Sequence, residues 1–302
     1  MAGIVLAAVG IMGLSRGSDN LSREHENSIA YRLLIQQGES LVEGVARATE
    51  PAIARGRLMA SDPALKAMLA GGQTSALTDF CNREIARATE IDAVVIFDVS
   101  GVPLAMNSIY ADGSSIPQDR LSIVMGSEFR ERDIIAGCLN NTNGTELLEF
   151  QMSCDITPAL FKSVGLAVAH SVPVYDNAGV QVGVVSTRMR FERLAALLGE
   201  TRTPGSELRM HFVGADGRYF DEAMHRDQAW PMPPETISAI AASLRSTGTP
   251  HAAFEYGGSL NAVFSMQRLS TIDGGDIFVI ASLPDSVIGA QAAQARIIRS
   301  AL

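Results

Sequence analysis

The stretch SVPVYDNAGVQVGVVSTRMRFERL, residues 171–194, reads as a strand, a tight turn, a second strand and the start of a helix. A turn rich in Asp, Asn and Gly between two apolar runs predicts an antiparallel hairpin. The second strand is apolar but carries Arg188 in its middle. Because alternate residues of a strand face opposite sides, one face carries Val185, Thr187, Met189 and Phe191, and the other carries Val184, Ser186, Arg188 and Arg190. We expect the first face to pack on the core and Arg188 to point toward the other side of the sheet.

Helical patterns precede this hairpin. Apolar residues recur at helical spacing from Ser22 to Leu69, which predicts a long N-terminal helix over residues 17–70. Pro51 should kink or interrupt this helix. Residues 61–72, SDPALKAMLAGG, carry helix start and stop signals of their own, with Pro63 in the first turn and two glycines at the end. A further helix is predicted over residues 75–90.

Strand patterns begin at residue 92 and occur in two sets. DAVVIFDVSGVPLAMN (92–107) predicts a hairpin, a short helix follows over 126–141, and three more strands are predicted over 146–154, 164–176 and 180–191. After the segment RTPGSE (202–207), strands are predicted within 208–222 and over 252–258, 260–269 and 275–284. The first set forms a compact α+β unit, and the coarse repeat predicts a second antiparallel sheet.

Both ends of the sequence are predicted to be helical. GIVLAAVGIMGL (3–14) is uncharged and apolar, but it is shorter than the roughly 20 residues that span a bilayer. It fits either part of a transmembrane helix over residues 1–16 or a buried helix, and the polar sequence that continues from it without a helix breaker favours the first. Residues 286–302 are predicted as a second helix toward the membrane. The rest of the protein would then lie outside that membrane.

Composition and motifs exclude several classes of function. A net charge of −9 argues against general nucleic-acid binding, which needs a basic surface. The sequence contains no glycine-rich phosphate loop and no pair of histidines at metal-ligand spacing, and its G-x-S-x-G match, GLSRG (13–17), follows a predicted helix and not a strand, as a nucleophile elbow would require. We therefore expect no catalytic residues, no metal and no cofactor. Cys138 and Cys154 could form a disulfide in an oxidising compartment, or they and Cys81 could be unrelated thiols.

The order and spacing of these elements resemble the double Cache sensory domain of bacterial transmembrane receptors. The most similar stretches are AVVIFDVSGVPL (93–104) and SVPVYDNAGVQVGVVSTRMRFERLAALL (171–198). The resemblance implies an α+β fold in which a long N-terminal helix carries two tandem PAS-like antiparallel-sheet modules, a membrane-distal ligand-binding module over residues 71–200 and a proximal module over 201–285. It also implies a sensor in the periplasm or outside the cell, anchored in the inner membrane and dimeric through its first helix. The output would be a kinase, a cyclase or a chemotaxis region.

The amino-acid-binding members of this family have Arg-x-Trp-Tyr-x-x-Ala on a short helix and an Asp on the last distal strand. The first motif falls on RERDIIA (130–136), where Arg130 and Ala136 match but Arg132 and Asp133 replace the two aromatic residues. Arg188 occupies the position of the Asp. This reversal of charge should repel an ammonium and attract an anion, because an unpaired buried charge is costly. The departure argues against amino-acid binding at this site.

The candidate site therefore centres on Arg188. A guanidinium pairs bidentately with carboxylates and stays charged when buried, and Arg130 or Arg132 could converge with Arg188 on a small organic acid. The other candidate ligand-binding residues are Asn107, Tyr110, Asp133, His170 and Ser186. In the alternative interpretation, Arg188 and Arg190 lie on a solvated face and pair with Glu192 or Asp133, residues around Arg132 form an exposed charged turn, and His170 is a hydrogen-bonded core residue.

The predicted function is the sensing of a small anionic ligand outside the cytoplasm. Binding in the distal module would displace the long helix, and this displacement would pass to the membrane. Two other functions stay open. One is a sensor that binds a protein partner and no small molecule, and the other is a hydrolase, although the sequence shows no nucleophile–base set.

Overall fold

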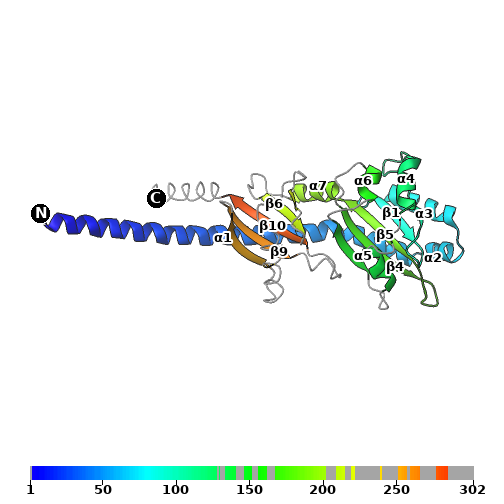
Figure 1. The fold of residues 1–302 in the computed structure, drawn as a ribbon, viewed down its shortest axis with the longest axis horizontal. Coiled ribbons are helices and arrows are strands. Elements are labelled where there is room, and N and C mark those ends of the chain that lie inside the picture. Colours follow the sequence, from blue (N-terminus) through cyan, green and yellow to red (C-terminus); the bar gives the residue numbers. More distant parts are fainter. Residues whose placement is uncertain are drawn as a thin grey trace.

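Two antiparallel sheets lie along one long helix (Figure 1). The structure is a computed structural model that describes the backbone of residues 2–127, 129, 133–140, 146–151, 156–161, 167–201, 209–214, 219–221, 239, 251–256, 259–265 and 277–284. The first part contains α1 (Ala2–Ser61), α2 (Pro63–Ala70), α3 (Thr74–Arg87), β1 (Ala93–Phe97), β2 (Pro103–Met106), α4 (Gln118–Met125), α5 (Asp133–Asn140), β3 (Leu147–Gln151), α6 (Ile156–Phe161), β4 (Ala167–Tyr175), β5 (Gln181–Arg190) and α7 (Phe191–Thr201). The second contains β6 (Arg209–Gly214), β7 (Tyr219–Asp221), β8 (His251–Tyr256), β9 (Ser259–Ser265) and β10 (Ile277–Pro284).

The two sheets have the same topology. Their strand orders are β2-β1-β5-β4-β3 and β7-β6-β10-β9-β8, so each strand of the first sheet has a counterpart five strands later in the chain. All strand pairs are antiparallel. The α+β fold with two antiparallel sheets and the internal repeat, both expected from the sequence, are confirmed. The predicted helix over 286–302 and the segment 202–207 fall outside the described residues.

The long N-terminal helix expected from the sequence is present as α1, which ends at Ser61 and not at residue 70. Pro51 lies inside α1 and does not interrupt it, so the expected interruption at Pro51 is wrong. A proline removes one intrahelical hydrogen bond, but Pro51 is exposed, which leaves the affected carbonyl accessible to water, and packing holds the helix on both sides. α1 ends at Ser61, and α2 follows directly, capped by the side chain of Asp62, which accepts a hydrogen bond from the backbone N of Ala64 at 2.7 Å. Within the described residues, no helix is both long and apolar enough to span a membrane.

Two hairpins with identical turns set the register of the first sheet. Oδ1 of Asp98 accepts hydrogen bonds from the backbone N of Ser100 and Val102 at 2.7 and 2.9 Å. Oδ1 of Asp176 accepts the corresponding two bonds in the β4–β5 turn, both at 2.8 Å. The third residue after each aspartate is a glycine with φ of 80°, which residues with a side chain rarely adopt. The turns thereby fix which residues of β1, β4 and β5 share a face.

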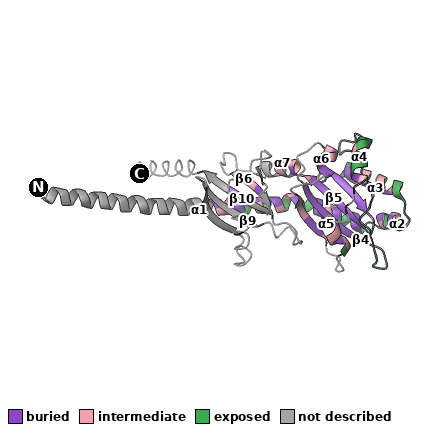
Figure 2. Ribbon diagram, in the orientation of Figure 1, coloured by how far each residue is buried: buried purple, intermediate pink, exposed green. Residues whose placement is uncertain are grey.

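The first sheet is buried on both faces, as Figure 2 shows for β4 and β5. One face carries Val172, Val185 and Met189, which share a hydrophobic cluster with α1, α2 and α3. The opposite face carries Val95, Ala169 and Val184, which share a second cluster with α4, α5 and α6. The expected alternation of β5 is therefore confirmed. Helices α4 and α6 were not predicted, because each is short and lacks a clear helical period.

Helix α1 packs closely on β4 at Gly56. A Cβ atom added there would lie 2.5 Å from Nδ1 of His170 on β4. We expect Gly56→Ala to lower the free energy of unfolding by about 1–3 kcal/mol, although alanine favours a helix over glycine by about 1 kcal/mol, because overpacking outweighs propensity. Urea unfolding measures the change, and the double substitution Gly56→Ala/His170→Ala should recover part of it. A more stable single variant would show that α1 adjusts to the methyl group without cost.

Candidate functional site

Arg188 lies in the middle of β5 and is buried, with 2% of its surface exposed. Its neighbours in register are Ala93 of β1 and Ala169 of β4, whose single methyl groups cannot cover a guanidinium. Nη1 donates hydrogen bonds to Oγ of Ser186 and, at 3.0 Å, to the backbone carbonyl of Thr187. Nε is buried and has no hydrogen-bond partner. Among the residues that the structure describes, Arg188 forms no ion pair, so a buried cation is left with unused hydrogen-bonding capacity.

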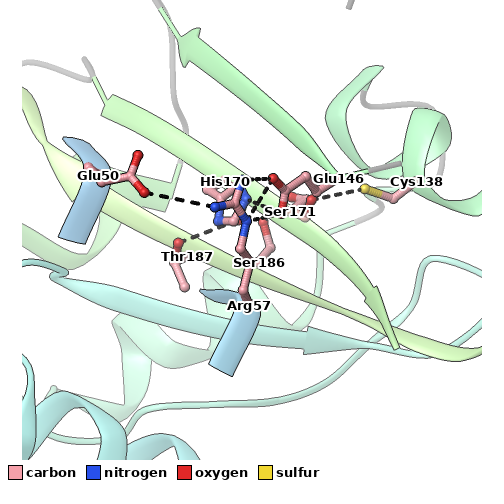
Figure 3. A network of polar contacts seen from close by, with 8 residues as sticks. All are labelled: Glu50, Arg57, Cys138, Glu146, His170, Ser171, Ser186 and Thr187. Atoms are coloured by element: carbon pink, nitrogen blue, oxygen red, sulfur yellow. Dashed lines mark hydrogen bonds and ion pairs between the residues drawn. The ribbon is translucent and has the colours of Figure 1, made fainter. Parts of the chain in front are cut away.

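The surroundings of Arg188 are mostly apolar. The side chains of Val95, Ile135, Leu147 and Leu160 belong to the cluster on this face of the sheet. Two hydroxyl groups interrupt it, Oγ of Ser171 and Oγ of Ser186, which lie 2.5 Å apart and are drawn in Figure 3. Ser186 thus holds one nitrogen of Arg188 and is itself held by Ser171. The guanidinium is fixed in position by polar groups on one side only.

Cys138 of α5 packs on the same face of the sheet as Arg188. Its Sγ lies 3.3 Å from the backbone carbonyl of Ser171, to which it donates a hydrogen bond. Burial raises the pKa of this thiol to about 12, so it stays protonated and unreactive at neutral pH. Cys138 is a free thiol and not half of a disulfide, and Cys81 is free as well. Cys154 lies outside the described residues.

Tyr110 and Asn107 are both held by other parts of the fold. The Tyr110 hydroxyl donates to the backbone carbonyl of Leu160 at 2.8 Å and accepts from Nη1 of Arg120 at 3.0 Å, which joins α4 to α6 over the sheet. Asn107 is fully buried, accepts from the backbone N of Val94 at 2.8 Å and donates to the carbonyl of Ile109 at 2.9 Å. Tyr110 therefore belongs, with α4 and α6, to the layer that covers the sheet face carrying Arg188. The amide of Asn107 instead links β1 to the segment after β2.

The structure does not bring His170 together with Arg188. His170 pairs with Thr187 in the β4–β5 register, so its side chain lies on the α1 face, opposite to that of Arg188. There Nε2 lies 3.4 Å from Oε2 of Glu146, and Nε of Arg57 on α1 donates to both oxygens of Glu146 at 2.9 Å (Figure 3). The interpretation of His170 as a core residue fits this position better. Sequence alone did not indicate Glu146, because it lies 89 residues from Arg57.

Asp92 is a further residue that sequence reasoning missed. Its carboxylate is buried, with 3% exposed, and accepts hydrogen bonds from the backbone N of Arg190 and from Nη2 of Arg193, both at 2.8 Å. Nε of Arg190 lies 3.2 Å from the same carboxylate, and the Arg190 guanidinium stacks 4.8 Å from the centre of the Phe161 ring. The alternative in which Arg188 and Arg190 lie on a solvated face is therefore wrong for Arg188, which is buried, and Arg190 pairs with Asp92.

Of three further candidates, the structure describes only the backbone of Asp133. Arg130 and Arg132 lie outside the described residues, and Asp133 is the first residue of α5. Helix α5 contacts β3, β4 and β5, so it covers the sheet face that carries Arg188. Of the eight candidates, the structure gathers Arg188, Ser186 and the cover residue Tyr110 on this face, and it assigns His170 to the other.

The Glu146–His170 pair should make stability depend on pH in two separate ranges. Burial lowers the pKa of His170 from its usual 6.5, so the unfolded chain takes up this proton first and stability falls as the pH drops below about 6.5. The hydrogen bond from Arg57 lowers the pKa of Glu146 from its usual 4.5, so its contribution is present above pH 4.5 and is lost at lower pH. Urea unfolding between pH 7.5 and about pH 5 should show a shallower decline for His170→Gln than for the unchanged protein. Equal slopes would contradict the buried, neutral state of His170.

Comparison with known proteins identifies the fold. No protein-family model and no curated protein matches the sequence. The ligand-binding domain of the Pseudomonas fluorescens chemoreceptor CtaA, in complex with L-isoleucine, is similar with a TM-score of 0.53 and 14% identity, over 88% of this chain and 98% of that one. The ligand-binding domain of the Pseudomonas aeruginosa PAO1 amino acid chemoreceptor PctB, in complex with L-Gln, gives 0.51 and 13%, over 89% and 98%.

A third solved structure contains this fold within a longer chain. An extracellular ligand binding receptor from Desulfohalobium retbaense DSM5692 matches with a TM-score of 0.50 and 11% identity, over 83% of this chain but only 39% of that one. Structures of this kind are Cache-type extracellular ligand-binding domains of receptors. The chain therefore has the double Cache fold that its sequence resembles, at an identity that establishes the fold alone.

Proposed function

We propose that this chain is the extracytoplasmic ligand-sensing domain of a bacterial transmembrane receptor and that it binds a small organic anion, a carboxylate, on the α4–α6 face of the first sheet. The observation that carries the proposal is the buried guanidinium of Arg188 with its unpartnered Nε. A buried cation is costly unless an anion pairs with it, and a carboxylate matches the fork of a guanidinium. The fold supports a sensory role, because it is shared with extracellular ligand-binding domains.

The organisation that we propose follows the two sheets. Residues 71–200 would be the membrane-distal, ligand-binding module and residues 201–285 the proximal module, with residues 1–16 and 286–302 leading to the membrane. The protein would act as a homodimer through the long N-terminal helix, as receptors with parallel signalling helices do. It would need no cofactor, metal or catalytic residue.

Ligand binding and conformational change would be coupled at β5. Arg188 is almost completely covered, so a ligand reaches it only when elements over this face of the sheet move apart. The other face of the same strand contributes Val185 and Met189 to the cluster that includes α1. A shift of β5 toward a bound anion would therefore act on α1 directly, and α1 would carry the displacement toward the membrane.

Thermal unfolding in the presence of small carboxylates tests the proposed function. A ligand that binds only the folded state raises the melting temperature. At a ligand concentration of a hundred times Kd, it adds about 2.7 kcal/mol to the free energy of unfolding. Arg188→Ala should remove the shift, whereas Arg47→Ala, at an exposed arginine of α1, should keep it. A shift that persists unchanged in Arg188→Ala would show that the anion binds elsewhere.

A further inference from the structure

We infer that the ligand of the Arg188 site is a monocarboxylate with a small branched apolar tail, and neither a dicarboxylate nor an amino acid. This inference rests on the proposed function and narrows the class of anion. It depends on which charged groups near the site are free to bind a ligand, and on the side chains that surround Arg188.

The other described arginines close to this face already have partners. Arg190 and Arg193 share the carboxylate of Asp92, and Arg190 also stacks on Phe161. Nη1 of Arg120 donates to Tyr110 and, at 2.8 Å, to the carbonyl of Leu160. In the described part of the chain, Arg188 is thus the arginine on this face with a buried nitrogen that makes neither a hydrogen bond nor an ion pair. One available guanidinium matches one carboxylate.

Among the described residues next to Arg188 in the sheet, none offers a free carboxylate to an ammonium group. The nearest residues in register are Ala93 and Ala169, and the carboxylate of Asp92 already accepts hydrogen bonds from Arg193 and from the backbone N of Arg190 and forms an ion pair with the Arg190 guanidinium. Glu149 of β3 lies one strand beyond Ala169 and is itself engaged in an interaction. A buried ammonium without a carboxylate of its own is strongly disfavoured, so the site should reject amino acids.

The tail of the ligand should be apolar and compact. The apolar cluster on this face of the sheet includes Val95, Ile135, Leu147 and Leu160, and Ala93 and Ala169 flank Arg188 in register. Three polar groups on this face already have partners, because Ser171 and Ser186 bond to each other and the Cys138 thiol bonds to the Ser171 carbonyl. A second carboxylate on the tail would lose its hydration without a second free arginine among the described residues to pair with.

Four matched compounds test the inference. 3-Methylbutanoate carries one carboxylate and a branched tail, methylsuccinate replaces one methyl with a second carboxylate, L-valine adds an ammonium, and 3-methylbutanamide removes the charge. Titration calorimetry on the full chain should show 3-methylbutanoate binding at least about tenfold more tightly than each of the other three, since each change leaves a charge unpaired or removes the ion pair. Arg188→Gln should abolish this binding, and Arg188→Lys should weaken it roughly tenfold, because lysine keeps the charge but lacks the fork.

The outcomes separate this inference from the proposed function. Tighter, Arg188-dependent binding of methylsuccinate would show that a second cation takes part, and tighter binding of L-valine would show an acidic partner. Either result overturns the inference and leaves the anion-sensing function standing. Binding of 3-methylbutanoate that is unchanged in Arg188→Gln, with Arg47→Gln as the surface control, overturns the proposed function itself. Absence of binding by all four compounds overturns the inference.

Discussion

Replacing Asp92 with alanine should lower the free energy of unfolding by about 3–5 kcal/mol, because it leaves two partly buried arginines without their shared carboxylate. The side chains of Arg190 and Arg193 are 33% and 24% exposed, so water can compensate only part of this loss. The substitution also removes the acceptor for the backbone N of Arg190, at the end of β5. Asp92 therefore ties the start of β1 to the junction between β5 and α7.

Urea unfolding of Asp92→Ala and Asp92→Asn measures this contribution. The asparagine variant keeps an acceptor for the backbone N and should lose less stability than the alanine variant. Asp79→Ala, at an exposed aspartate of α3, is the matched control and should stay within about 0.5 kcal/mol of the unchanged protein. A loss for Asp92→Ala as small as that of the control would mean that both arginines are solvated after the substitution.

Replacing Arg188 with methionine should have the opposite effect on stability. A buried ion that is only partly paired costs free energy, and a well-packed apolar residue in its place often stabilises a protein by about 1–4 kcal/mol. Methionine would enter an apolar cluster, and Ser186 would keep its hydrogen bond to Ser171. The variant should nevertheless lose all ligand-induced thermal stabilisation. A gain of stability with a loss of binding is expected where a residue is retained for function.

The same urea and thermal measurements decide this prediction. The control is Arg120→Met, which removes an arginine with satisfied hydrogen bonds to Tyr110 and Leu160 and should destabilise the protein. If Arg188→Met also lowered the free energy of unfolding, by an amount comparable with the about 3–5 kcal/mol of a broken buried ion pair, Arg188 would be a structural residue. The anion-binding role would then have no support from stability.

Much of the architecture could be predicted from local patterns. The turn sequences DVSGV (98–102) and DNAGV (176–180) predicted two hairpins, and the structure shows the same aspartate and glycine geometry in both. The register of the second hairpin also separates His170 from Arg188. Because Arg188 pairs with Ala169 and Thr187 with His170, that register already places His170 and Arg188 on opposite faces.

The partners of charged residues could not be predicted in this way. Asp92 contacts Arg190 across 98 residues of chain, and Glu146 contacts Arg57 across 89. No spacing rule connects such positions, since the pairs form only after the strands and α1 have packed. Helices α4 and α6 were missed for a related reason, because they are held mainly by contacts such as those between Tyr110, Arg120 and Leu160.

The sequence by itself determined the order of the strands, the repeat of two sheets and the side of β5 on which Arg188 lies. These features depend on periodicity and turn chemistry, which act between residues close in the chain. Only the tertiary structure decided that Arg188 is buried without a described carboxylate partner, that Asp92 binds Arg190 and Arg193, and that His170 packs under Gly56 of α1. Burial and ion pairing depend on which distant segments meet, and that is fixed by the packing of the whole chain.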